Sequence, residues 1–276
     1  SCGTRGRAPY KGVLTHGFTL DEKGMKMSKS QKNITSPQKV VDQYGADILR
    51  LWVSQSDYSV DQRIGQEILK GVSDSYRKLR NTLRFILGNL NDFNSGEVVG
   101  YNELPEIEKW VLYRIFCLDK IIRAGYEKYA FQSVIQHILH FCSMDLSAFY
   151  FDVRKDVLYC NSHDDIVRRS TRTVLDKIFY YISSWIAPVL VFTAEEVWLS
   201  RFPDTKVSVH LTDFPTPPEY WNYEELESKW NFIREVRKVV SGAIELSRQK
   251  KLIGASLESH PKVFIDSKER LSFLGE

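Results

Sequence analysis

Residues 66–90 read QEILKGVSDSYRKLRNTLRFILGNL, and this stretch decides the fold class. Its apolar side chains recur at the three- and four-residue steps that place them on one face of an α-helix. They are Ile68, Leu69, Val72, Tyr76, Leu79, Leu83, Ile86, Leu87 and Leu90. The spacing predicts an amphipathic helix of about seven turns that buries one face against other elements.

The same period continues for about 140 residues. Helices are expected over 105–129 and 131–158, from the capping box Ser162-x-x-Asp165 to Pro188, and after a second box, Thr193-x-x-Glu196. Four or five long helices with short connections predict an antiparallel helix bundle, so the fold class is mainly α. Residues 202–220 hold four prolines and are typical of a linker, and residues 222–251 predict one further long helix.

The residues before the bundle follow a different pattern. β-Branched and aromatic residues over 10–20 predict a strand, 21–24 a turn, and 25–27 a returning hairpin arm. Residues 28–35 are polar and aperiodic, which indicates a loop. Ser36-Pro37 and Gly45 then bracket one short helix, and residues 46–55 predict a second.

The amino-acid composition excludes several classes of protein. The 276 residues are 43% hydrophobic and 26% charged, which excludes a disordered chain, and no apolar run approaches the ~18 residues of a membrane span. Four cysteines without Cys-x-x-Cys spacing predict reduced thiols and no zinc site, and two histidines three residues apart, His137 and His140, have no third ligand. Residues 1–39 carry eight Lys/Arg and two Asp/Glu, so positive charge gathers where a polyanion could bind.

The chemistry of the chain lies in the loop Lys26-Met27-Ser28-Lys29-Ser30. Two lysines three residues apart, with hydroxyls between and beside them, suit a mobile clamp for phosphates. Gly24 and Asn33 on either side would let such a loop close and reopen. The alternative is an ordinary solvated surface, because most Lys-x-x-Lys tetrapeptides bind nothing.

These five residues match the KMSKS signature of the class I aminoacyl-tRNA synthetases. Longer runs resemble the isoleucyl-tRNA synthetase family in particular. They are Arg5 to Tyr10, Thr15 to Leu20, Gly45 to Val53, Ser56 to Tyr58, Tyr76 to Phe85, Asp145 to Tyr150 and Ala194 to Trp198. The resemblance covers almost the whole chain.

The resemblance implies ATP-dependent activation of isoleucine and transfer of the acyl group to tRNA(Ile), with ATP accompanied by Mg²⁺. Lys26 to Ser30 would bind ATP: Lys29 would contact the leaving pyrophosphate, Lys26 would assist, and Ser28 and Ser30 would shape the loop. No HIGH-type tetrapeptide, the family's other ATP-binding signature, occurs in the sequence. The chain is therefore expected to begin within the catalytic domain, to end before the natural C-terminus, and to be inactive alone. A cytoplasmic monomer without membrane contact is also expected.

In domain terms, the resemblance implies the end of a Rossmann-type catalytic domain over 1–45 and a connecting helical segment over 46–65. An anticodon-binding bundle follows over 66–203, then a linker and the start of a junction region over 204–276. Candidate tRNA-binding side chains are Arg77, Arg80 and Arg84, which lie within about 60° on one helix, together with Arg168, Arg172 and Trp230. The alternative for each arginine is a solvated or ion-paired helix face.

Two other functions stay open at this point. The same segment could come from a valyl- or leucyl-tRNA synthetase, since the amino-acid pocket is not in these residues. A stand-alone RNA-binding helix bundle is the second alternative, although such a module has no use for an intact pyrophosphate clamp.

Overall fold

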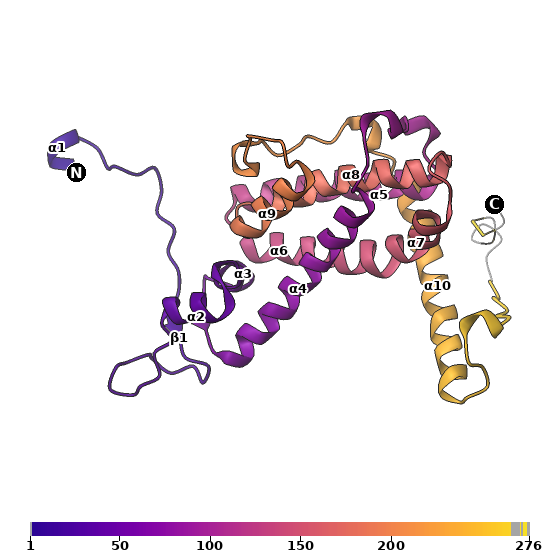
Figure 1. The fold of residues 1–276 in the computed structure, drawn as a ribbon. Helices are drawn as coiled ribbons and strands as arrows, with labels where there is room; N and C mark the ends of the chain where they lie inside the picture. Colours follow the sequence, from indigo (N-terminus) through magenta and orange to yellow (C-terminus); the bar gives the residue numbers. More distant parts are fainter. Residues whose placement is uncertain (1, 266–270, 272, 275–276) are drawn as a thin grey trace. The chain divides into compact units, whose positions relative to one another are not determined.

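The computed structural model describes residues 2–265, 271 and 273–274, and helices dominate this part of the chain (Figure 1). The chain divides into two compact units. The larger unit comprises the residues up to Leu104 together with Leu118–Thr216, and the smaller unit combines Pro105–Cys117 with the residues from Pro217 onward.

The helices confirm a mainly α fold. The larger unit contains α1 (Cys2–Arg5), α2 (Pro37–Tyr44), α3 (Ala46–Gln55), α4 (Gln66–Asn89), α6 (Phe131–His140), η3 (Phe141–Tyr150), α7 (Phe151–Cys160), α8 (Ile166–Ile186) and α9 (Val191–Arg201). Short 3-10 turns lie at η1 (Ser95–Glu97), η2 (Tyr101–Glu103) and η4 (Val209–Leu211). Helix α5 (Glu106–Glu127) contributes its first half to the smaller unit and its second half to the larger one.

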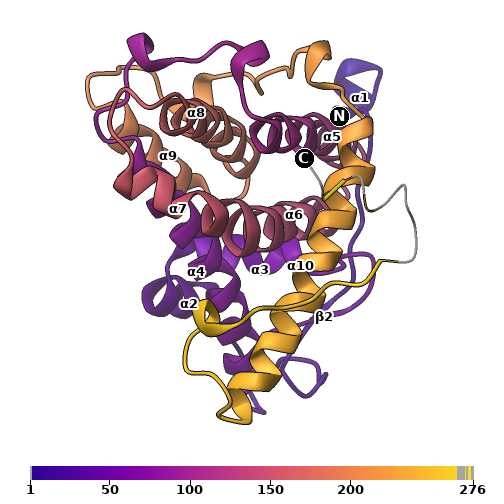
Figure 2. The ribbon, with the colours of Figure 1, turned by 90° about the vertical axis from the view of Figure 1, so that its right-hand side faces the viewer.

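The core of the larger unit lies where α4 meets α8 and η3 (Figures 1 and 2). The apolar face of α4 is buried there through Leu79, Leu83 and Ile86, which are at most 1% exposed. The segment expected as one helix over 131–158 runs from α6 through a π-helical stretch, η3, into α7, which ends at Cys160. The predicted periodicity therefore holds, but the winding loosens in its middle.

The predicted strand over 10–20 is wrong for most of its length. Only Thr19–Leu20 (β1) is a strand, in parallel pairing with Gln62–Arg63 (β2). A strand needs a hydrogen-bonding partner, and in the described part of the chain the segment after Tyr58 is the partner that β1 meets. The backbone hydrogen bonds to this partner begin at Gly17 N, which donates to Tyr58 O at 2.9 Å. No segment of the described chain pairs in this way with residues 10–16.

Helix α9 shows how a remote residue can replace a local cap. Its start at Val191 places the predicted Thr193-x-x-Glu196 box inside the helix. The acceptor for its first amides is Asp47 of α3: the Asp47 carboxylate accepts from Phe192 N at 3.3 Å and from Thr193 N at 2.8 Å. Thr193 Oγ1 also donates to Asp47 at 2.6 Å. The N-terminus of α9 is therefore anchored to α3, the second helix after the lysine loop.

The smaller unit is built on α10 (Glu225–Gln249), with η5 (Glu219–Trp221) before it and η6 (Ser256–Glu258) after it. Within this unit Lys229 pairs with Glu106 at 2.9 Å, and the Tyr113 hydroxyl donates to Glu227 at 2.9 Å. These contacts join α10 to the first half of α5. Among the residues that the structure describes, no helix is both long and apolar enough to cross a lipid bilayer.

Candidate phosphate loop and nucleic-acid interface

The loop with the two lysines begins where the chain turns back after β1. Leu20 and Lys26 form an antiparallel bridge, and Gly24 in the turn has a φ of 79°, a conformation that glycine adopts without strain. The side chains of Lys26 and Lys29 are exposed. Their ammonium groups make no hydrogen bond or ion pair with any residue that the structure describes. Both charges are open to an incoming anion.

The other loop residues are turned toward one another. The hydroxyl oxygens of Ser28 and Ser30 lie 3.1 Å apart, and Ser28 Oγ accepts from the amide of Gln31 at 3.3 Å. Met27 is half-buried, and its sulfur lies 3.4 Å from the amide nitrogen of Thr35. The serines and Met27 thus hold the loop's shape while the lysines project from it.

Asn33 closes the base of the loop. Its amide nitrogen donates to the Asp21 carboxylate at 2.8 Å and to Lys26 O at 3.2 Å, and its oxygen accepts from Ser28 N at 2.9 Å. The sequence suggested only a turn residue at this position. The structure instead makes Asn33 a clamp that joins the two ends of the lysine segment.

The Asp21 carboxylate shows the effect of this clamp. Its pKa lies below the ordinary value of 3.8, chiefly because the Asn33 amide donates to it, with the Met25 amide as the next cause. Asn33→Ala is therefore expected to raise the pKa of Asp21 toward 3.8, which NMR titration of carboxyl carbons measures. Asp57 is the control, because its lowered pKa depends on Ser59. An unchanged Asp21 pKa would mean that the clamp does not form in solution.

The three candidate arginines of α4 differ in their partners. Arg77 pairs with Asp74 one turn away at 2.8 Å. Arg80 donates through both terminal nitrogens to the two Glu196 oxygens, at 2.9 and 2.8 Å, and also donates to the Tyr76 hydroxyl at 3.2 Å. Arg84 is exposed and makes no hydrogen bond or ion pair within the described ranges. Only Arg84 among these three presents an uncompensated charge.

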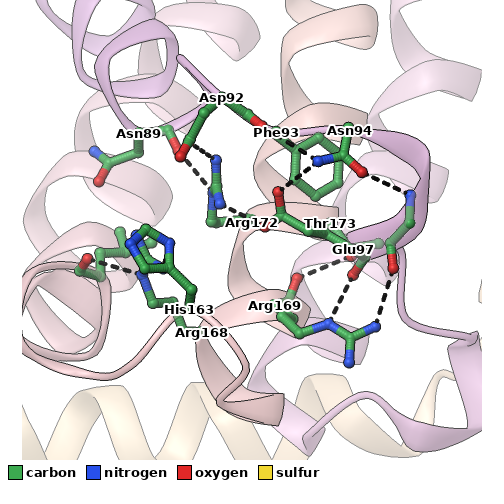
Figure 3. A network of polar contacts seen from close by, with 12 residues as sticks. Asn89, Asp92, Phe93, Asn94, Glu97, His163, Arg168, Arg169, Arg172 and Thr173 are labelled. Carbon is green, nitrogen blue, oxygen red and sulfur yellow. Dashed lines mark hydrogen bonds and ion pairs between the residues drawn. The ribbon is translucent and has the colours of Figure 1, made fainter.

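The candidate arginines of α8 lie in an internal network (Figure 3). Arg172 is 1% exposed and donates to the Asn89 carbonyl at 3.0 Å and to the carboxylates of Asp92 and Glu97. Its guanidinium also stacks over the Phe93 ring, 5.4 Å from the centroid. The prediction that Arg172 contacts RNA is wrong, because the acidic segment after α4 covers its charge.

The neighbours of Arg172 take part in the same arrangement. Arg168 donates to Leu158 O at 3.3 Å and lies 2.7 Å from His163 Nδ1. Arg169 reaches Glu97 O at 3.3 Å, as Figure 3 shows. Both are half-buried, so RNA contact by Arg168 stays a prediction. Trp230, in the smaller unit, is half-buried with its ring 6.0 Å from that of Trp110, and base stacking by Trp230 also stays a prediction.

Comparison with protein families assigns the chain. The family described as "Anticodon-binding domain of tRNA ligase" matches residues 108–263, and "tRNA synthetases class I (I, L, M and V)" matches residues 1–65. The chain therefore belongs to the class I tRNA ligases. The first match covers more than half of the sequence, and the second includes the lysine loop, β1 and β2.

Comparison with individual tRNA ligases shows which branch of the family the chain resembles. The chain is 55% identical over 277 residues to the isoleucine–tRNA ligase of Ruegeria pomeroyi and 51% identical over 274 residues to that of Agrobacterium fabrum. These alignments cover 100% and 99% of this chain and 28% of each relative. The resemblance to the isoleucyl branch is confirmed, and the valyl, leucyl and stand-alone alternatives are not favoured.

Solved tRNA ligases share the fold. A ternary complex of Agrobacterium radiobacter K84 agnB2 LeuRS, tRNA and LeuAMS aligns with a TM-score of 0.59 at 18% identity, over 75% of this chain and 24% of that one. Methionyl-tRNA synthetase of Mycobacterium tuberculosis, with methionyl-adenylate, aligns with a TM-score of 0.56 at 21% identity, over 74% and 42%. A helix bundle after the end of a catalytic domain is thus confirmed as the architecture.

Metal ligands are scarce around the lysine loop of this tRNA ligase. Across the described ranges, no three His, Cys, Asp or Glu side chains gather closely enough to hold a metal ion. Both oxygens of the Asp21 carboxylate accept hydrogen bonds, one from the Met25 amide and one from the Asn33 side chain. The charge that this segment offers to phosphates comes from its two exposed lysines, Lys26 and Lys29.

Sequence reasoning missed three residues that organise these surfaces: Asp21, Tyr76 and Glu196. Glu196 lies 116 positions from Arg80, so no local pattern links them. Asp21 and Asn33 are twelve positions apart in a loop without periodicity. Asp21 lies in the predicted turn and Asn33 in the predicted loop, and neither position specifies a partner.

Proposed function

We propose that this chain serves an isoleucine–tRNA ligase, which activates isoleucine with ATP and transfers the isoleucyl group to tRNA(Ile). The observation that carries the proposal is the pair of exposed lysine ammonium groups, Lys26 and Lys29, on a loop whose base Asn33 clamps. A compact ammonium with three donors suits phosphate oxygens, and its lack of an internal partner leaves it available.

In this reaction an isoleucine carboxylate oxygen attacks the α-phosphorus of ATP. The bond to the bridging oxygen breaks, and pyrophosphate leaves with the electron pair, giving isoleucyl-adenylate. A hydroxyl of the terminal tRNA adenosine then attacks the acyl carbon, and AMP leaves. Lys29 stabilises the negative charge that develops on the departing pyrophosphate, and Lys26 assists, because positioning and charge neutralisation dominate phosphoryl chemistry.

The helix bundle supplies the RNA side of the function. Its match to anticodon-binding domains supports binding of the anticodon stem and loop of tRNA(Ile). Arg84 is the best placed of the predicted arginines, because its charge is exposed and uncompensated. The secondary candidates would each have to give up an internal contact to bind RNA; they are Arg77, Arg80, Arg168 and Trp230.

The chain spans 28% of the length of the relatives quoted above, so the activity belongs to the longer enzyme. Residues 1–276 contain no HIGH-type tetrapeptide, and we expect no activation by these residues alone. The proposed enzyme is a monomer, works in the cytoplasm and uses ATP with Mg²⁺. We also propose domain boundaries after residues 45, 65 and 203.

Amino-acid-dependent ATP–pyrophosphate exchange by the complete enzyme tests the assignment. Isoleucine should support exchange with a higher kcat/KM than valine, because valine leaves the space of one methylene unfilled in a pocket shaped for isoleucine. Leucine should support less. Preference for valine or leucine would contradict the isoleucine assignment, and the absence of exchange with all three would contradict the ligase itself.

A further inference from the structure

Helices α4 and α9 enclose a groove on the surface of the larger unit. Its volume is about 440 Å³, within the roughly 300–1,000 Å³ of ligand-binding clefts. The groove reaches the last turn of α4 at Gly88 and continues to Asn91, just beyond the end of the helix. It is separate from the lysine loop, none of whose residues lines it.

Arginines dominate the charge of this groove. Arg80, Arg84 and Arg201 line it, and Glu196 is the one acidic residue in its lining. The charge of Arg201 is compensated by Asp176 at 3.0 Å, whereas Arg84 has no partner in the part of the chain that the structure describes. The groove therefore offers one free guanidinium and a second, Arg80, held by a single carboxylate.

That carboxylate occupies the position that a phosphate would take. Glu196 meets Arg80 through both oxygens, in the parallel two-point geometry that guanidinium groups also use for phosphates. Hydrogen bonding from Arg80 holds the pKa of Glu196 below its ordinary value, so the carboxylate is charged near neutral pH. Both side chains are about half exposed, 44% for Arg80 and 56% for Glu196, and exposed pairs of this kind exchange readily.

Gly88 leaves room for a polymer backbone. Arg80, Arg84 and Gly88 follow one another at four-residue steps, so they lie on one face of α4 about 6 Å apart along the axis. A Cβ built at Gly88 meets no heavy atom within 4 Å. The helix backbone is thus uncovered at Gly88, one turn after Arg84.

We propose that the groove between α4 and α9 binds the sugar-phosphate backbone of tRNA, with Arg84 and Arg80 on separate phosphates and Glu196 as the internal counter-ion that RNA displaces. This inference rests on the proposed function, because it assigns part of the RNA surface. On this proposal Glu196 lies inside the RNA-binding surface and yet lowers the affinity of that surface for RNA.

The charge test compares two substitutions that each remove one negative charge from an ion pair. Glu196→Gln is expected to tighten binding of a tRNA(Ile) transcript about threefold to tenfold at a fixed salt concentration, because Arg80 then binds its phosphate without giving up an internal carboxylate. Glu67→Gln is the matched control, because Glu67 pairs with Lys70 on α4 outside the groove. It should change Kd by less than about twofold. Arg84→Gln should weaken binding and flatten the slope of log Kd against log salt by about 0.7–0.9, the value of one lost phosphate contact.

The steric test compares two glycines of α4. Gly88→Ala adds a methyl group at the groove without a clash in the free chain, so it should weaken RNA binding about fivefold or more while leaving the melting temperature unchanged or higher. Gly71→Ala is the matched control, because a Cβ there also meets nothing within 4 Å and Gly71 does not line the groove. It should leave Kd unchanged.

The outcomes separate the two proposals. If the unmodified chain binds tRNA(Ile) but Glu196→Gln and Gly88→Ala behave like their controls, the groove assignment is overturned and the proposed function stands. If the unmodified chain binds no tRNA at low salt, the groove assignment falls together with the RNA-binding part of the proposed function, whereas the ligase assignment still depends on exchange by the complete enzyme. Inorganic phosphate should displace the RNA no better than chloride at equal ionic strength; preferential displacement would make the groove a site for an isolated anion and overturn the assignment to RNA.

Discussion

In the complete enzyme, Lys29→Ala is expected to slow isoleucine-dependent ATP–pyrophosphate exchange by about 10²–10³-fold, the loss measured when one charge-stabilising donor is removed from a reacting centre. The structure supports this size of effect because the Lys29 ammonium is exposed and has no partner in the described part of the chain that could keep it from the phosphates. The loss should fall on kcat, since the interaction strengthens as the pyrophosphate leaves.

Lys23→Ala is the control for this prediction. Lys23 is an exposed lysine in the turn just before the loop, so its loss removes the same charge from the same neighbourhood. Exchange should change by less than about threefold in that variant, and tRNA binding should be unchanged in both. Equal rates for Lys29→Ala and the unmodified enzyme would remove Lys29 from the chemistry and return the loop to a solvated surface.

Arg172→Met is expected to lower the free energy of unfolding by about 2–4 kcal/mol. Removing one partner of a buried ion pair is strongly destabilising, and here the change also orphans the Asn89 carbonyl. Asp92 is 62% exposed and regains water, so the expected loss is below the largest values known for buried pairs. Urea unfolding followed by tryptophan fluorescence measures it.

Arg77→Met is the matched control, because Arg77 has an exposed partner one turn away and its loss should cost no more than about 0.5 kcal/mol.

The network around Arg172 also makes stability depend on pH. Burial raises the pKa of Asp92, but Arg172 more than offsets this, so the pKa lies below 3.8. The stabilisation is then present above that ordinary value and is lost as the pH falls through the lowered pKa. If Arg172→Met left stability unchanged and weakened tRNA binding, the RNA role would be restored.

Local signals predicted the parts of the fold that depend on local chemistry. Ser36-Pro37 and Gly45 bracket α2 at its observed bounds, and α3 and α4 begin at the expected residues. Each rests on a start or stop residue beside a clear helical period.

Long-range contacts explain the failures. The strand expected over 10–20 shortened to two residues because strand length depends on the neighbouring chain, which sequence does not show. A cluster of arginines over 168–172 predicts that Arg172 contacts RNA, whereas the acidic residues that cover Arg172, Asp92 and Glu97, come from another segment. The lysine loop was predictable because its motif is contiguous, while its clamp by Asn33 was not.

The cap that Asp47 places on α9 bears on how this protein can be divided. A recombinant bundle that begins at Gln66, or at residue 108 where the family match starts, lacks the carboxylate that accepts from Phe192 and Thr193. In such a shortened protein α9 would fray, and α9 is the side of the groove that carries Glu196. The helical unit that folds as one piece therefore includes the short helix α3, so isolating the RNA-binding part requires a cut upstream of Ala46.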